Sequence, residues 1–182
     1  PERAVDYLYY NMYMGGSMSG VIFQEIREAR ALAYSSSGGY GTGDKKGDET
    51  IVWGGLGTQA DKAVEASALL SKLLRELPPS EARFAETRKA VEEDFRTGVV
   101  TFREVPGTIH EWEEKGIPKD PRPERFKRAL AYTAKDLESF AARFKDKTLA
   151  IYVLGHPDRV DQKGLSGLGE VQVLKIDDLF PY

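Results

Sequence analysis

One stretch of this chain holds the residues best suited to chemistry. It runs from Met14 to Tyr34 and carries the guanidinium of Arg27 and the phenol of Tyr34, seven residues apart. A guanidinium is a permanently charged cation with several hydrogen-bond donors, and a phenol is a neutral donor that can stabilise an oxyanion. Spacing alone favours the ordinary structural interpretation, an arginine near a helix end and a tyrosine packed at the start of a strand.

The glycines of this stretch raise the possibility of phosphate binding. Gly15 and Gly20 have the outer spacing of a phosphate-binding loop and lead into the N-terminus of a helix. That chemistry needs a lysine and a hydroxyl next, but the following residues are Val21 and Ile22. The glycines therefore favour a tight turn over a nucleotide site.

A second glycine pattern suggests a dinucleotide site. Residues 55–60 read Gly-Leu-Gly-Thr-Gln-Ala and lie between a predicted strand and a predicted helix, as such a fingerprint requires. A parallel strand ending in a ribose-binding acid should follow that helix. Pro78-Pro79 and another helical pattern follow instead, so this interpretation is rejected.

The remaining side chains offer little catalytic chemistry. His110 and Glu114 lie one helical turn apart, but a catalytic zinc usually needs three protein ligands, so a charged, solvated helix face is favoured. His156 follows a glycine in a predicted turn. The chain has no cysteine, which excludes disulfides, thiolate nucleophiles and zinc-cysteine clusters.

Composition indicates one soluble domain over residues 1–182. The formal net charge is −3 with acids and bases mixed, which argues against a nucleic-acid or anionic membrane surface. No apolar run is long enough to cross a bilayer, and the absence of cysteine leaves periplasmic and cytoplasmic locations open. Because the chain begins inside a helical pattern at Pro1, we expect a fragment of a longer protein.

Hydrophobic periodicity predicts the elements that position Arg27 and Tyr34. A helix precedes the glycines, another carries Arg27, and two strands after Tyr34 form a hairpin. Two long helices then follow, with caps at Thr58 and Ser80, and they should pack on one face of the sheet. A capping box at Thr133 opens a later helix, and residues 149–154 and 171–176 are predicted strands, the former central and buried. This order favours an α+β fold, with helices on one side of a mainly antiparallel sheet.

The motif resembles a known signature. Gly15 to Ser19, Phe23 to Glu28 and Leu32 to Tyr34 look like the non-zinc, C-terminal half of pitrilysin-type metallopeptidases, the group that includes insulinase and the mitochondrial processing peptidase. Weaker likeness extends over most of the chain, and the tail resembles the end of long bacterial members. The family more often shows glycine, serine, arginine, lysine and glycine at five positions, which here are Ser17, Gly20, Val21, Ala29 and Ala31.

The resemblance implies a fold and a role. In that family a strand precedes the first helix, so the sheet is expected to lack its first strand. Nothing here matches the family's inverted His-Xaa-Xaa-Glu-His zinc motif, so the fragment is expected to hold no cofactor and to be inactive alone, with zinc in the other half. By resemblance, Arg27 binds substrate backbone, and Tyr34 binds substrate and donates a hydrogen bond to the scissile carbonyl in the transition state.

The implied partners are a zinc-bearing N-terminal half, in the same chain or in a partner subunit, and a peptide substrate, with no nucleic acid or membrane. A second hypothesis remains open: the chain is a catalytically silent scaffold or partner-subunit domain of the same fold that mediates protein–protein interaction. There, Arg27 and Tyr34 would be packing residues. An inverted zinc motif upstream would favour the peptidase, and its absence would favour the scaffold.

Overall fold

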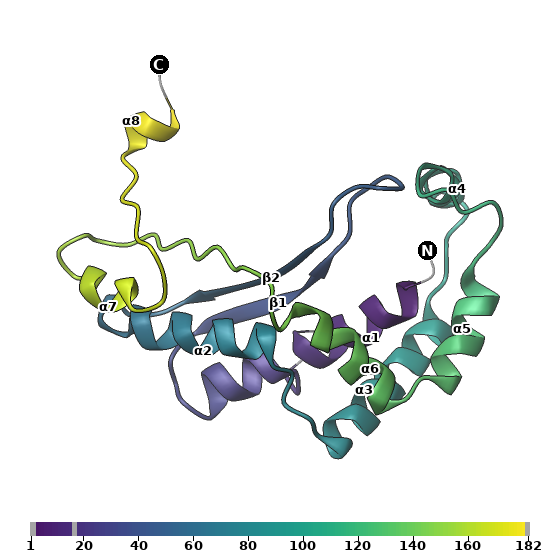
Figure 1. Ribbon diagram of the computed structural model, residues 1–182. Helices are drawn as coiled ribbons and strands as arrows, with labels where there is room; N and C mark the ends of the chain where they lie inside the picture. Colours follow the sequence, from purple (N-terminus) through teal and green to yellow (C-terminus); the bar gives the residue numbers. More distant parts are fainter. Residues whose placement is uncertain (1–2, 16–17, 181–182) are drawn as a thin grey trace.

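The structure, a computed structural model, describes residues 3–15 and 18–180. One hairpin follows the first two helices of the chain, and the remaining elements are helices (Figure 1). The strands are β1 (Ser35–Gly41) and β2 (Ile51–Gly57), and the short π- and 3₁₀-helices are η1 (Phe23–Glu28), η2 (Ala60–Lys62) and η3 (Ala142–Phe144). The α-helices are α1 (Ala4–Met14), α2 (Ala63–Arg75), α3 (Glu81–Thr97), α4 (Val105–Glu114), α5 (Arg122–Ala131), α6 (Ala134–Ala141), α7 (Gln162–Ser166) and α8 (Ile176–Leu179).

Helix α1 is the centre of the hydrophobic core. Tyr9, Tyr10 and Met14 are almost completely removed from solvent, and α1 contacts β1, α3, α5 and α6. Aromatic rings tie these elements together: Tyr10 meets Phe140 of α6 edge-on, with ring centroids 5.6 Å apart. Burial of several large rings in one cluster is the main source of stability for a domain of this size.

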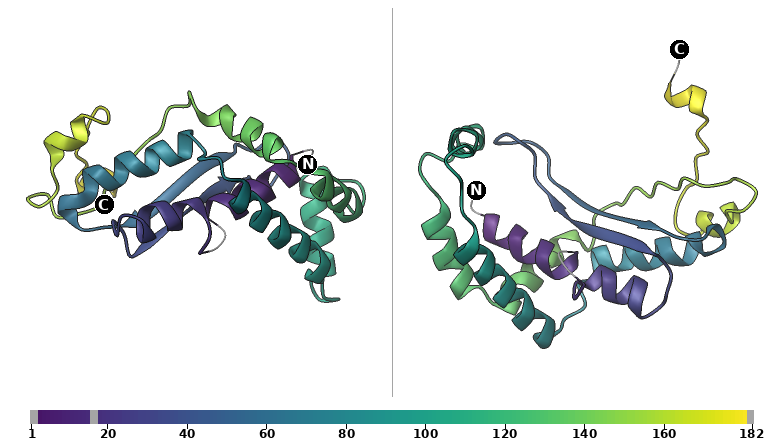
Figure 2. Two further views of the ribbon diagram at one scale, coloured as in Figure 1. Left: turned by 90° about the horizontal axis from the view of Figure 1, so that it is seen from below. Right: turned by 180° about the vertical axis from the view of Figure 1, so that it is seen from behind.

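The hairpin lies over the helices. β1 and β2 pair antiparallel, from Ser35 opposite Gly57 to Gly41 opposite Ile51. Helices α1, α2 and α6 lie below the two strands in the right view of Figure 2, on one side of the hairpin. The end of α1 comes so close to β1 that a Cβ on Gly15 would collide with the backbone of Gly38, which explains the glycine at that point.

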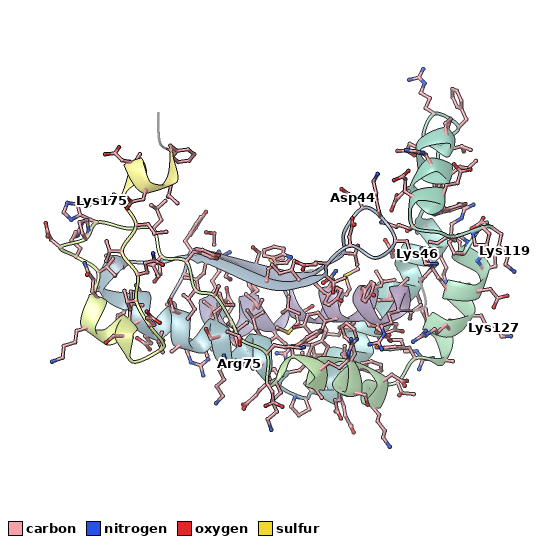
Figure 3. All side chains as sticks on the ribbon, turned by 45° about the horizontal axis from the view of Figure 1, so that its top comes forward. Asp44, Lys46, Arg75, Lys119, Lys127 and Lys175 are labelled. Carbon is pink, nitrogen blue, oxygen red and sulfur yellow. The ribbon has the colours of Figure 1, made fainter. Side chains whose placement is uncertain are left out.

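The far end of the hairpin reaches the segment around α4. The backbone N–H of Lys46 donates to the carbonyl of Glu114 at 2.9 Å, and the ammonium of Lys45 lies 3.1 Å from the Glu114 carboxylate. Figure 3 labels Asp44 and Lys46 at this tip. The turn of the hairpin is therefore held in place by α4.

The α+β class is confirmed, and so are the hairpin and the helices predicted on either side of it. Ser80 caps α3 by accepting the N–H of Arg83 at 3.2 Å, and Thr133 with Asp136 forms the expected capping box. Within the described residues no strand precedes α1. None of the helices that the structure describes is both long and apolar enough to span a membrane.

Two predicted strands are not formed. Residues 149–154 and 171–175 have no regular secondary structure, Ile176 begins α8, and the apolar side chains Tyr152 and Leu154 are exposed (Figure 1). An apolar run becomes a buried strand only when a sheet edge and two covering layers are available, and the described sheet consists of β1 and β2. The prediction of a central buried strand at 149–154 is wrong for this structure.

The packing of the two long helices also differs from the prediction. Helix α2 packs against β2 as expected, whereas α3 packs against α1 and α5. On α3 the buried residues are Thr87 and Val91, and most others are charged or exposed. So narrow a buried stripe fits the groove between two helices better than the broad face of a sheet.

The buried tyrosines predict a loss of stability at alkaline pH. Tyr9 is fully buried, its hydroxyl donates to the carbonyl of Ala129 at 2.8 Å, and burial raises its pKa to about 12. An unfolded tyrosine ionises near pH 10, so unfolding releases a proton between pH 10 and 12. This contribution is complete below pH 10 and is lost as pH rises toward 12, at up to about 1.4 kcal/mol per pH unit.

The measurement is the free energy of unfolding in urea from pH 9 to pH 11. Tyr9→Phe should be less stable at pH 9, because the carbonyl of Ala129 loses one of its two donors and keeps only the N–H of Tyr132, and should decline less steeply with pH. Tyr152→Phe is the matched control, since Tyr152 is 90% exposed and the loss of its hydroxyl should leave the stability at pH 9 unchanged. Equal slopes for wild type and Tyr9→Phe would contradict the assignment.

Candidate functional site

The helix that carries Arg27 is wider than an α-helix. Residues Phe23–Glu28 form the π-helix η1, and the N–H of Ala29 bonds to the carbonyl of Gln24, five residues back, at 2.9 Å. Single turns of π-helix are uncommon and often occur at functional sites. Gly16 and Ser17, which belong to the motif, lie outside the described residues.

Arg27 lies between two aromatic rings. Its guanidinium carbon is 4.8 Å from the ring centroid of Phe23, one turn earlier, and 5.4 Å from that of Tyr34. The Nε of Arg27 is also 3.8 Å from a carboxylate oxygen of Glu28. Cation–π contacts of this kind restrain a long side chain while leaving its N–H groups available. The structure thus brings together the two residues that the sequence singled out.

A left-handed turn returns the chain from the helix to Tyr34. Ala31 has a φ of +50°, and it is the one non-glycine residue with positive φ in the described part of the chain. The N–H of Ala31 bonds to the carbonyl of Arg27 at 2.9 Å, and the N–H of Leu32 to that of Ile26 at 3.0 Å. Helices commonly end in this way, usually with glycine at the left-handed position. Residue 31 is one of the positions where the resemblance expects glycine.

This geometry predicts that Ala31→Gly stabilises the fold. The left-handed conformation costs an alanine about 1–2 kcal/mol, and the greater freedom of glycine in the unfolded chain takes back about 0.5–1 kcal/mol. We expect the free energy of unfolding to rise by about 0.5–1 kcal/mol in urea denaturation. Ala29→Gly is the matched control: its φ is −75°, so glycine there should destabilise by a similar amount. Destabilisation by both changes would contradict the turn.

Tyr34 is an exposed side chain on a fixed backbone. The ring is 87% exposed, whereas Leu32 and Ala33 just before it are buried. Ser35, just after it, pairs with Gly57 as the first residue of β1. The strand thus begins one residue later than predicted, within the usual uncertainty of a boundary. Anchors on both sides hold the phenol out from the surface beside Arg27.

The other candidates do not gather into a site. Within residues 3–15 and 18–180, no group of three or more histidine, cysteine, aspartate or glutamate residues is placed to hold a metal ion. His110 lies on α4, and His156 is 3.8 Å from the carboxylate of Asp158 in an exposed turn. Both positions agree with the structural interpretation of these histidines.

The Arg27–Tyr34 pair lies on an open surface. A shallow groove of about 310 Å³ between η1 and α2 is lined by Glu25, Arg30 and Lys72, among others, and neither Arg27 nor Tyr34 belongs to its lining. A donor on an open surface competes with water for any substrate oxygen, which weakens its effect. The structure therefore leaves both side chains accessible to solvent, outside this groove.

Comparison with known protein families gives a match over residues 1–91 to the family described as the peptidase M16 inactive domain. This match covers half of the chain and includes the whole Arg27–Tyr34 motif. The chain belongs to the peptidase M16 inactive-domain family. It is a non-catalytic, C-terminal M16 domain, in agreement with the resemblance drawn from the motif. A search of curated proteins gave no match.

Solved structures share the fold of this chain. The M16 inactive domain from Pseudomonas fluorescens matches with a TM-score of 0.66 at 13% identity, covering 79% of this chain and 34% of that one. A conserved protein from Enterococcus faecalis matches with a TM-score of 0.59 at 16% identity, covering 79% and 33%. A protease from Helicobacter pylori matches with a TM-score of 0.54 at 16% identity, covering 77% and 34%. The chain spans about a third of the length of these structures.

Proposed function

We propose that this M16 domain closes the substrate chamber of a zinc-dependent endopeptidase and supplies Arg27 and Tyr34 to bind substrate and stabilise the transition state. The zinc is held by another half, in the same polypeptide or in a partner subunit. The observation that carries the proposal is the contact between Arg27 and Tyr34, 5.4 Å from guanidinium carbon to ring centroid, on an exposed surface. Membership of the M16 inactive-domain family supports it.

Each side chain has a defined task. Arg27 keeps its cation between two rings and directs N–H donors at the carbonyl groups of an extended peptide. Tyr34 donates its phenolic hydrogen to the scissile carbonyl oxygen as negative charge develops there. A neutral donor suits this task, because it stabilises an oxyanion without pairing with a nearby carboxylate base. The other half would hold the zinc, which would supply Lewis-acid activation of the carbonyl and of the attacking water, while this chain supplies Arg27 and Tyr34.

Exposure of the pair is consistent with this division of labour. A hydrogen-bond donor in water gains little from meeting an oxyanion, whereas the same donor in an enclosed chamber gains several kcal/mol. Tyr34 is 87% exposed here, so its effect depends on a second surface that covers it. Catalysis is thereby coupled to closure of the two halves, as in enzymes with lids.

The first test is the sequence of the half that is proposed to hold the zinc. The coding region upstream of this chain, or the gene of a co-purifying subunit, should encode an inverted His-Xaa-Xaa-Glu-His motif with a distant glutamate. Absence of that motif from both would contradict the peptidase and favour a silent scaffold, in which Arg27 and Tyr34 serve packing alone.

A further inference from the structure

Thr58 makes a long-range contact that its place in the sequence does not suggest. It follows the last residue of β2, and its hydroxyl donates to the carbonyl of Leu32 at 2.5 Å, 26 residues away in sequence. The capping box predicted at this position is not formed: the N-cap of η2 is Gln59, with no side-chain cap bond. The hydroxyl bonds to the turn before Tyr34 instead.

This bond holds the turn before Tyr34 in place. The N–H of Leu32 bonds to the carbonyl of Ile26 at 3.0 Å, so Thr58 satisfies the second polar group of a residue that is only 7% exposed. A buried carbonyl without a hydrogen-bond partner costs free energy, so loss of this bond would destabilise the fold. Ser35 opposite Gly57 closes the same loop from the other side. Tyr34 lies between the two anchors.

We infer that Thr58 is a positioning residue for Tyr34: its hydroxyl holds the Leu32 carbonyl and thereby fixes the direction in which the exposed phenol points. The inference rests on the proposed function of Tyr34. Thr58 does not touch the substrate; it acts through two residues of backbone. A displacement of about 1 Å in a catalytic donor is enough to reduce turnover strongly.

The test compares Thr58→Val with Thr58→Ser in the enzyme that contains both halves. Valine keeps the shape and removes the hydroxyl, and serine keeps the hydroxyl. We expect Thr58→Val to lower kcat about tenfold with KM changed less than twofold, and Thr58→Ser to retain most of the wild-type kcat. Thr58→Ala replaces the valine variant if the latter does not fold, since it removes the same hydroxyl without adding bulk.

Coupling to Tyr34 separates positioning from general stability. In a Tyr34→Phe background, Thr58→Val should have no further effect on kcat, because the group it positions is gone. Independent, multiplying losses would overturn the inference, and so would a wild-type kcat for Thr58→Val in an enzyme that Tyr34→Phe impairs. A wild-type kcat for Tyr34→Phe would instead refute the proposed function, and the inference with it.

Discussion

Tyr34→Phe is expected to lower kcat for peptide hydrolysis by about 100-fold in the enzyme assembled from both halves, with KM within about twofold of the wild-type value. Loss of one oxyanion donor costs about 3 kcal/mol, and each 1.36 kcal/mol is a factor of ten in rate. Phenylalanine keeps the ring beside Arg27 and removes the hydroxyl alone. A loss confined to kcat is the kinetic signature of a contact made only in the transition state.

Tyr152→Phe is the control for this variant. Tyr152 is 90% exposed and lies in the irregular segment 149–154, far along the chain from the site. It should leave kcat and KM unchanged. The substitution at Tyr34 affects a side chain that is almost fully exposed, so the thermal stability of the domain should not change. A wild-type kcat for Tyr34→Phe would remove Tyr34 from the mechanism.

Arg27→Ala is expected to raise KM about 10- to 100-fold and to lower kcat as well. A charged hydrogen bond to substrate contributes about 1.5–3 kcal/mol, which gives the effect on binding. The effect on kcat follows because the Tyr34 ring loses the cation that it packs against. Arg27→Lys should recover part of the binding, since an ammonium keeps the charge but lacks the planar fork of donors.

Arg103→Ala is the matched control for Arg27→Ala. Arg103 also lies over an exposed ring, with its guanidinium carbon 5.6 Å from the centroid of Phe102, but in a different part of the molecule. Steady-state kinetics over a range of peptide concentrations should give this variant the kcat and KM of the wild type. Equal changes in both arginine variants would show that Arg27 acts through net charge and has no specific place at the substrate.

Local patterns account for what the sequence predicted correctly. The capping box at Thr133 and the cap at Ser80 are hydrogen bonds between residues three apart in the sequence, and both are formed. The hairpin follows from a polar, glycine-rich segment and a β-type run at 50–53 that are joined by a charged turn. Neither prediction requires knowledge of what the rest of the chain does.

Long-range packing accounts for the failures. The apolar run at 149–154 shows that these residues are suited to a strand. A strand also needs a neighbouring strand to pair with, and that depends on how the whole sheet is assembled. In the same way, Thr58 fits a capping pattern by sequence, but its hydroxyl bonds to the carbonyl of Leu32, which the hairpin brings next to it. A local motif cannot predict a competitor that comes from 26 residues away.

The candidate site was found by its motif, and its geometry was not predictable. The spacing of Arg27 and Tyr34 predicts neither the π-helix nor the cation–π contacts of the guanidinium with two rings. The available signals were Phe23, four residues before Arg27, and the alanine at position 31 in place of the expected glycine. Neither signal specifies the left-handed turn at Ala31, which returns the chain to Tyr34.

The most direct measurement is peptide hydrolysis by the zinc-bearing half with and without this chain. We expect no significant hydrolysis by this chain alone, little by the zinc-bearing half alone, and zinc-dependent hydrolysis when the two are combined, with activity lost on chelation. The Tyr34→Phe chain should bind the zinc-bearing half as tightly as wild type and restore about a hundredth of the rate. Full activity of the zinc-bearing half alone, or full restoration by the Tyr34→Phe chain, would contradict the proposed role of this domain.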